Sequence, residues 1–164
     1  MLLDQRIHLI GIGGAGLSAI ATVLLERGHV VSGSDVCESS LTKKLQSLGA
    51  VVYIGHKAAN ISDADLVIVS SAISVTNPEL LAATKNNIQV LKRQDILGAL
   101  MKNRVGCAVA GSHGKTTTTA LISFCLLECG LNPMFIVGGL VNDLDTNARY
   151  SEGEPFVVEA DEYD

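Results

Sequence analysis

The stretch Gly111-Ser112-His113-Gly114-Lys115-Thr116-Thr117 joins two segments of different character. The apolar segment 105–110 precedes it, and residues 117–129 after it follow a helical pattern. A glycine loop between a strand and a helix directs backbone N–H groups and the positive end of the helix dipole at an anion. We expect Lys115 to reach the terminal phosphates of a nucleotide and Thr116 to bind the accompanying magnesium ion. Residues 111–117 are therefore a predicted phosphate loop.

A second glycine loop, Gly11-Ile12-Gly13-Gly14-Ala15-Gly16, lies near the N-terminus. It follows the apolar segment 7–10, precedes a helical pattern, and is trailed by Asp35 at the end of the next expected strand. This spacing is typical of dinucleotide-binding loops, in which glycines admit a diphosphate close to the backbone and a carboxylate binds a ribose. A UDP-sugar meets the same requirements as NAD. The residues of this loop do not decide between NAD and a UDP-sugar as the ligand. A tight turn that binds no ligand is the third alternative.

Strand-like and helix-like segments alternate along the chain. Strands are expected at residues 7–10, 29–35, 51–54, 64–71 and 88–91, and helices at 17–27, 41–48, 77–83 and 93–102. This alternation predicts an α/β fold with a doubly wound, Rossmann-like parallel sheet. We place that domain at residues 1–103. The pattern then restarts, so residues 104–164 are expected to begin a P-loop ATPase domain, with strands too few to complete it.

Polar side chains follow several of the expected strands. Ser70 and Ser71 follow the fourth strand, and Glu159 ends the last one. Ligands of parallel sheets collect at the carboxyl edge. A strand that delivers a carboxylate beside a phosphate loop commonly places it near magnesium and the γ-phosphate, so Glu159 is a candidate metal ligand, followed by Asp161 and Glu162. A solvated acidic turn is the alternative for Glu159, and a polar strand end for the serines.

The composition argues against several classes of protein. The formal net charge is −5, and no lysine or arginine cluster alternates with aromatic residues, which disfavours nucleic-acid binding. No apolar run is long enough to cross a bilayer and no signal peptide is recognisable, so we expect a cytoplasmic protein without membrane insertion. The four cysteines lack metal-ligand spacing and are expected to be reduced, buried packing residues. His8, His29 and His56 lie in no motif and are expected to be ordinary surface or packing residues.

Several stretches, taken together, resemble the Mur ligases of bacterial peptidoglycan synthesis. They occur in family order along the whole chain, at residues 7–18, 31–35, 69–73, 77–79, 110–119, 147–149 and 158–162. The combination is far more specific than either glycine loop alone. Ser112 stands where relatives often have threonine, a change that keeps the hydroxyl group.

The resemblance implies an ATP-dependent ligase that forms an amide through an acyl phosphate. ATP would bind Gly111, Ser112, His113, Gly114, Lys115, Thr116 and Thr117. Lys115 and Glu159 would be catalytic, and Thr116 and Glu159 would hold Mg²⁺. The UDP-sugar would face Gly13, Gly14, Ala15, Gly16, Ser34, Asp35, Ser70 and Ser71. Phosphoryl transfer needs no side-chain nucleophile, in keeping with the absence of a Ser/His/Asp pattern from the sequence.

Three branches of function are compatible with these features. The loop at residues 11–16 favours the addition of L-alanine to UDP-N-acetylmuramate, with these two compounds as substrates. Tyr163 after Asp161 and Glu162 also fits the ligases that recycle a tripeptide onto the same sugar nucleotide, which rank second. A non-catalytic NAD(P)- or nucleotide-sugar-binding module ranks third, since it leaves the phosphate loop unexplained. The family resemblance implies a C-terminal domain beyond this sequence, so we expect the chain alone to be inactive.

Overall fold

The computed structural model describes residues 5–141, 144 and 146–160. The chain divides into two compact units, Met1–Ile96 and Leu97–Asp164. The division falls within helix α4 (Arg93–Met101). The expected domain boundary after residue 103 stays a prediction.

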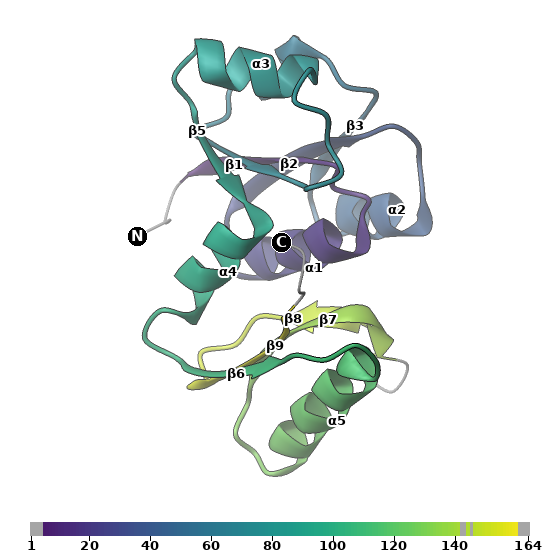
Figure 1. Cartoon of the computed structure of the whole chain (residues 1–164), viewed down its shortest axis with the longest axis vertical. Helices are drawn as coiled ribbons and strands as arrows, with labels where there is room; N and C mark the ends of the chain where they lie inside the picture. The colour runs from purple at the N-terminus through teal and green to yellow at the C-terminus, as the bar shows by residue number, and fades with distance from the viewer. Residues whose placement is uncertain (1–4, 142–143, 145, 161–164) are drawn as a thin grey trace. The chain divides into compact units, whose positions relative to one another are not determined.

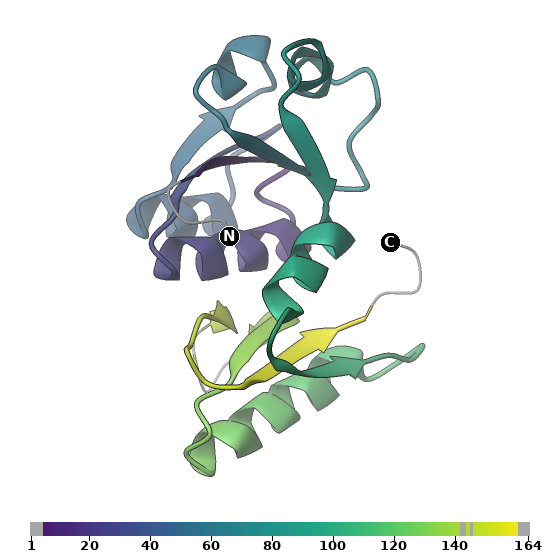
Figure 2. The ribbon, with the colours of Figure 1, turned by 90° about the vertical axis from the view of Figure 1, so that its left-hand side faces the viewer.

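The first unit alternates strands and helices, as the sequence pattern predicts. Its elements are β1 (Arg6–Ile10), α1 (Ala15–Glu26), β2 (Val30–Asp35), α2 (Ser40–Ser47), β3 (Val51–Ile54), η1 (Ala58–Ile61), β4 (Leu66–Val69), α3 (Pro78–Lys85), β5 (Gln89–Lys92) and the start of α4. The strands are parallel, in the order β3-β2-β1-β4-β5. Helix α3 covers one face of this sheet, and α1 and α2 cover the other (Figures 1 and 2). The predicted Rossmann-like parallel sheet is confirmed.

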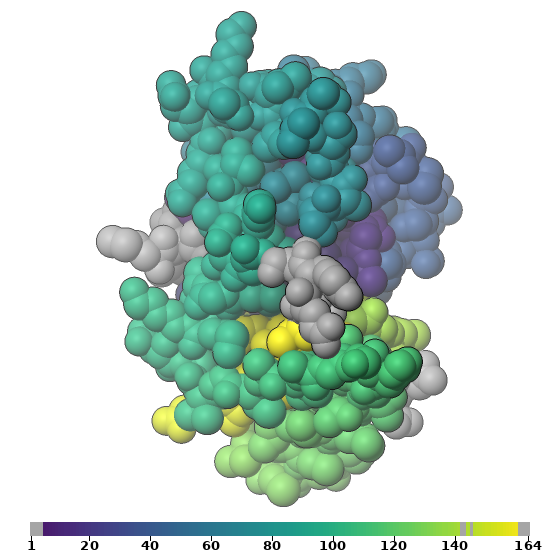
Figure 3. Space-filling view, in the orientation of Figure 1, coloured from purple at the N-terminus to yellow at the C-terminus, as the bar shows by residue number. Residues whose placement is uncertain are grey.

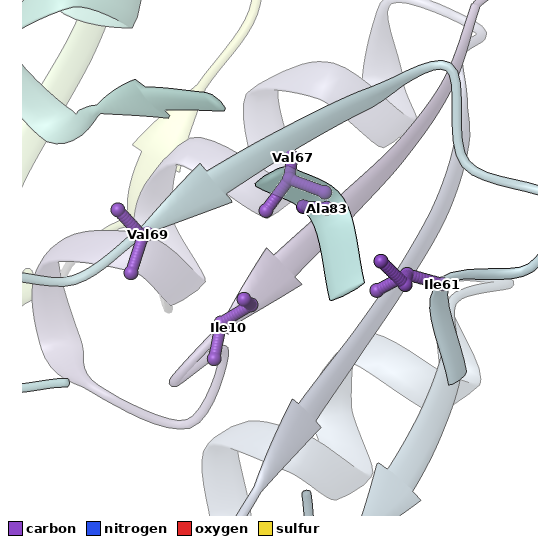
Figure 4. Packing of buried hydrophobic residues seen from close by; sticks show 5 residues of the cluster. All are labelled: Ile10, Ile61, Val67, Val69 and Ala83. Atoms are coloured by element: carbon purple, nitrogen blue, oxygen red, sulfur yellow. The ribbon is translucent and has the colours of Figure 1, made fainter. Parts of the chain in front are cut away.

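A hydrophobic core packs between the sheet of the first unit and the elements that cover its α3 side. On the α3 side, Ile10, Val67 and Val69 of the sheet pack with Ile61 of η1 and Ala83 of α3 (Figure 4). Burial of each such aliphatic side chain contributes about 1.5–3 kcal/mol.

The strand order reverses direction between β1 and β4, which makes the carboxyl ends of these two strands the topological switch point. Ligands of open α/β sheets bind at that point.

The second unit contains a smaller, mixed sheet. Its elements after α4 are β6 (Val105–Val109), α5 (Lys115–Glu128), β7 (Met134–Val141), β8 (Thr146–Arg149) and β9 (Pro155–Glu159). The strands lie in the order β6-β9-β7-β8, with β7 and β8 antiparallel and the other pairs parallel. Helix α5 packs on one face, against a cluster that includes Phe135, Val137 and Val157. Figures 1 and 2 both show α5 along this sheet.

Several local expectations are wrong. The sequence patterns do not include β8 among the expected strands, because its four residues are too few and too polar to show a strand pattern. Helix α5 begins at Lys115 and not at residue 117, so Lys115 and Thr116 belong to its first turn. The cysteines, all within the described residues, are free; three of them are exposed and Cys107 is partly buried.

No helix within the described ranges is long and apolar enough to cross a membrane.

Gly33 of β2 offers a test of the packing between sheet and loop. A Cβ at this position would lie 2.5 Å from Ile12 Cδ1 and 2.7 Å from the carbonyl oxygen of Leu9. Because that carbonyl belongs to the backbone of β1, we expect Gly33→Ala to lower the free energy of unfolding by about 1–3 kcal/mol. Gly98→Ala is the control, since its Cβ would meet nothing within 4 Å inside α4. Thermal unfolding measures both, and an unchanged midpoint in Gly33→Ala contradicts the packing described.

Candidate functional site

The phosphate loop (residues 111–117) carries the chain from β6 into α5. Gly111 and Gly114 have φ values of 144° and 77°, a region that residues with a side chain rarely adopt. Gly114 is the N-cap of α5, and no side chain in the described part of the chain caps that helix end. The first amides of α5 are therefore open to an anion. The loop lies at the surface, in green in Figure 3, with Ser112, His113 and Thr116 exposed.

Lys115 lies at the start of α5 and folds back over the loop. Its Nζ donates a hydrogen bond of 2.7 Å to the carbonyl oxygen of Gly111. The side chain is only partly exposed. The ammonium group is therefore held beside the loop, where it adds positive charge to the open amides of the helix end.

Strand β9 brings Glu159 to the same edge of the sheet as the phosphate loop. Strands β6 and β9 are parallel neighbours in which Val109 pairs with Glu159. The Ala160 N–H continues the ladder, with a hydrogen bond of 2.9 Å to the carbonyl oxygen of Val109. The Glu159 side chain is 6% exposed. Asp161 and Glu162, which the sequence analysis groups with it, lie outside the described residues.

Two consecutive glycines of β7, which sequence reasoning missed, lie against the predicted metal ligands. A Cβ at Gly138 would lie 2.6 Å from Glu159 Oε2, and a Cβ at Gly139 would lie 3.3 Å from Thr116 Cγ2. Thr116 and Glu159 therefore lie against successive residues of β7. A Gly-Gly pair inside an apolar strand is the signal that could have found this contact, because glycine in a strand often marks the close approach of another group.

These donors suit magnesium that arrives with a nucleotide. Thr116 offers a hydroxyl group and Glu159 a carboxylate whose Oε2 has no hydrogen bond within the described residues. Across those residues, no group of three or more His, Cys, Asp or Glu side chains could hold a metal ion by itself. Magnesium characteristically takes one or two protein oxygens and completes its shell with phosphate and water. Thr116 and Glu159 thus fit Mg²⁺ as a companion of bound phosphates.

The glycine loop of the first unit is tied to β2 by its backbone. The N–H groups of Gly11 and Ile12 both donate to the carbonyl oxygen of Ser34, at 2.8 and 3.1 Å. Gly14 is the N-cap of α1, and no side chain among the described residues caps this end. The α1 terminus therefore also offers open amides and the positive end of a helix dipole.

Three predicted ligand residues surround this loop. Asp35 Oδ2 accepts a hydrogen bond of 2.8 Å from the Gly13 N–H. Ser70 directly follows β4. A Cβ at Gly11 would lie 3.3 Å from the Cβ of Ser70, so this serine lies next to the loop that follows β1. Ser71 is exposed next to it. The structure thus brings Asp35, Ser70 and Ser71 to the loop edge that the sequence predicts.

Arg93, a residue that sequence reasoning missed, lies against the first turn of α1. A Cβ at Gly16 would lie 2.9 Å from Arg93 Nε and 3.5 Å from its Cζ. The guanidinium group therefore adds positive charge where the helix dipole is already positive. Gly16 opens the helix after β1 and Arg93 the helix after β5, and the fold of the parallel sheet brings these two distant positions together. No motif signals this approach.

Ser34 differs from the other predicted ligand residues because its side chain is fully buried. Its hydroxyl group donates to Glu79 Oε2 at 2.5 Å. Glu79, itself fully buried, also lies 3.0 Å from His56 Nδ1 and accepts a hydrogen bond of 2.6 Å from Asn60 Nδ2. Ser34 therefore supports the loop from within, through its carbonyl group and this network. The sequence does not reveal this network, because its members are far apart along the chain.

His8 of β1 completes the network. It is fully buried, with Nδ1 2.9 Å from Ser32 Oγ and Nε2 3.9 Å from Glu79 Oε1. Burial, with a smaller contribution from His56, lowers the pKa of His8 from 6.5 to about 4, against the opposing effect of the Glu79 carboxylate. His8 is therefore neutral at pH 7 and more than an ordinary packing residue.

Comparison with known proteins identifies the class. Residues 6–105 match the Mur ligase family, catalytic domain. The chain belongs to the Mur ligase family.

Several curated relatives are similar to this chain over almost its whole length. Over 160 residues the chain is 51% identical to UDP-N-acetylmuramate–L-alanine ligases of Psychrobacter sp. (strain PRwf-1) and Polynucleobacter asymbioticus, covering 98% of this chain and 34% of each relative. It thus spans about a third of their length.

Two solved ligases have similar structures. UDP-N-acetylmuramate:L-alanyl-gamma-D-glutamyl-meso-diaminopimelate ligase from Neisseria meningitides matches with TM-score 0.92 and 30% identity, covering 98% of this chain and 54% of that one. UDP-N-acetylmuramate–alanine ligase from Thermotoga maritima matches with TM-score 0.88 and 33% identity, covering 95% and 37%. The fold is therefore that of the N-terminal part of these ligases.

The buried His8 predicts a pH dependence of stability. Because its pKa is lowered to about 4 in the folded state, the unfolded chain binds the proton more readily. Stability should be fully present above pH 6.5 and fall as the pH drops from 6.5 towards 4, by at most about 3 kcal/mol. His8→Gln should flatten this part of the profile, while His113→Gln, in the exposed phosphate loop, should not. Urea unfolding at several pH values measures the effect, and identical profiles for the wild type and His8→Gln contradict it.

Proposed function

We propose that the protein containing this chain is an ATP-dependent ligase that joins L-alanine to UDP-N-acetylmuramate in peptidoglycan synthesis. One observation carries the proposal: Glu159 ends β9, the phosphate loop follows β6, and these parallel strands are neighbours that pair Val109 with Glu159. The 51% identity to L-alanine ligases supports the choice of amino acid. ATP and a sugar nucleotide are cytoplasmic compounds, which makes the cytoplasm the proposed location.

The second unit would bind ATP. The open amides of α5 and the ammonium group of Lys115 would bind the terminal phosphates, and Thr116 and Glu159 would hold Mg²⁺, which neutralises phosphate charge when bound. Phosphoryl transfer depends on alignment and charge compensation more than on covalent help. A carboxylate oxygen of the sugar would attack the γ-phosphorus and release ADP. The amine nitrogen of L-alanine would then attack the acyl carbon, releasing phosphate and a proton.

The first unit would bind the UDP-sugar at the loop of residues 11–16. The open amides of α1 and the nearby Arg93 guanidinium group favour a diphosphate. The Asp35 carboxylate, which already accepts a hydrogen bond from Gly13, would accept hydrogen bonds from the nucleoside. Ser70 and Ser71 lie next to this loop edge. A diphosphate with hydroxyl groups beside it would suit the chemistry of these groups.

A ligase that recycles the tripeptide is the second candidate, favoured by the TM-score of 0.92 to the Neisseria enzyme. Phosphate release by the complete protein, with ATP, Mg²⁺ and UDP-N-acetylmuramate, separates the two. Release that requires L-alanine supports the proposal, and release that requires L-Ala-γ-D-Glu-meso-diaminopimelate supports recycling. If neither compound stimulates release, both candidates fail, and a binding module without ligase activity replaces them.

Lys115→Ala in the complete protein should lower turnover by at least about a hundredfold, the scale for loss of one preorganised electrostatic contact. The reason is that the ammonium group held at the Gly111 carbonyl is lost from the phosphate loop. Lys102→Ala, at an exposed position between α4 and β6, is the control. Steady-state phosphate release measures both, and normal turnover in Lys115→Ala removes this residue from the mechanism.

Asp35→Ala should weaken the binding of UDP-N-acetylmuramate about tenfold or more while the affinity for ATP stays unchanged. The variant removes a charged hydrogen-bond acceptor at the end of β2, beside the loop of residues 11–16, a loss of about 1.5–3 kcal/mol. Asp63→Ala, at an exposed position ahead of β4, serves as the matched control. An unchanged Kd for the sugar nucleotide in Asp35→Ala, measured by fluorescence titration, refutes the role of the carboxylate.

A further inference from the structure

Gly138 makes an unusual hydrogen bond where β7 leaves β9. Along β7, the ladder between these strands ends with the pair Ile136 and Val158. Beyond it, the Gly138 N–H donates to Oε1 of the Glu159 side chain, at 2.8 Å. A backbone amide thus bonds a carboxylate that is 6% exposed. Such charge-assisted hydrogen bonds are stronger than neutral ones, so this amide orients the carboxylate.

Gly138 also leaves the space that the carboxylate occupies. A Cβ at this position would lie 2.6 Å from Glu159 Oε2, 3.2 Å from its Cδ and 3.4 Å from its Oε1. Gly138 is not among the glycines with positive φ, so close approach and not backbone freedom calls for glycine here. Any side chain at position 138 would push the Glu159 carboxylate out of its place.

We propose that Gly138 is a positioning residue for Glu159 and sets the direction in which this carboxylate meets the magnesium ion. With Oε1 bonded to the amide, Oε2 is the oxygen left for a cation, and Thr116 lies against the adjacent Gly139. Partners that orient a metal ligand typically contribute 10–100-fold to metal affinity or activity. The proposal rests on the proposed function, in which Glu159 holds Mg²⁺ with ATP.

A double-mutant cycle on the complete protein tests this role. Mn²⁺ is titrated by electron paramagnetic resonance in the presence of a non-hydrolysable ATP analogue, for the wild type, Gly138→Ala, Glu159→Gln and the double variant. Gly138→Ala should weaken Mn²⁺ binding by about 10–100-fold. In the Glu159→Gln background the same substitution should change it by less than about threefold, near the limit of additivity. Gly98→Ala, with open space around its Cβ, should bind as the wild type does.

The cycle separates failure of this inference from failure of the proposed function. If Glu159→Gln weakens Mn²⁺ binding but Gly138→Ala does not, the positioning role is refuted and the metal site stands. If Gly138→Ala weakens Mn²⁺ binding by the same factor in the wild-type and Glu159→Gln backgrounds, Gly138 does not act through Glu159. That result also refutes the positioning role. If Glu159→Gln binds Mn²⁺ as the wild type does, the metal site of the proposed function fails and this inference fails with it.

A second measurement needs neither metal nor a folded Gly138 variant. In a sample with ¹³C-carbonyl valine and ¹⁵N-glycine, the pairs Val137–Gly138 and Val105–Gly106 give selectively observable amide signals. Glu159→Ala removes the acceptor, so the Gly138 amide signal should shift upfield while that of Gly106 stays in place. A Gly138 signal that does not move in Glu159→Ala shows that the hydrogen bond is absent and overturns the inference.

Discussion

The parallel pairing of β6 with β9 is the constraint on which the candidate ATP site depends. Strand β6 leads into the phosphate loop and β9 ends at Glu159, so the register that pairs Val109 with Glu159 fixes the carboxylate relative to the loop. A slip of one residue would turn the Glu159 side chain to the other face of the sheet. The buried Phe156 and Val157 oppose such a slip, because it would exchange their environments too. Core packing thus sets the position of a polar group.

The two units share the same local arrangement of loop and helix, but the charged side chain beside the loop differs between them. Each has a glycine loop after its first strand and a helix whose N-terminus no side chain of the described residues caps. In the first unit a carboxylate, Asp35, bonds an amide of the loop. In the second an ammonium group, Lys115, bonds a carbonyl oxygen of the loop. A negative group beside one loop suits a ligand rich in hydroxyl groups, and a positive group beside the other suits a triphosphate.

Sequence patterns predicted most elements because local signals decide them. The alternation of apolar strands and helices gave the parallel sheet of the first unit, and glycine spacing located both loops. What the patterns missed depends on contacts between distant positions. Glu79 contacts Ser34, His56 and Asn60, which come from separate parts of the first unit. Arg93 approaches Gly16 although the two residues lie far apart in the sequence. The polar strand β8 was missed because its pairing with β7, and not its own composition, makes it a strand.

The central claim is that the two loops hold two different nucleotides at the same time. Calorimetric titration of the complete protein with UDP-N-acetylmuramate, in the absence and in the presence of saturating Mg–ATP, tests it most directly, with NAD as the competing ligand. The account predicts that the sugar nucleotide binds in both conditions and that NAD does not displace it. Tight binding of NAD with no response to the UDP-sugar, or mutual exclusion of the UDP-sugar and ATP, would contradict the account.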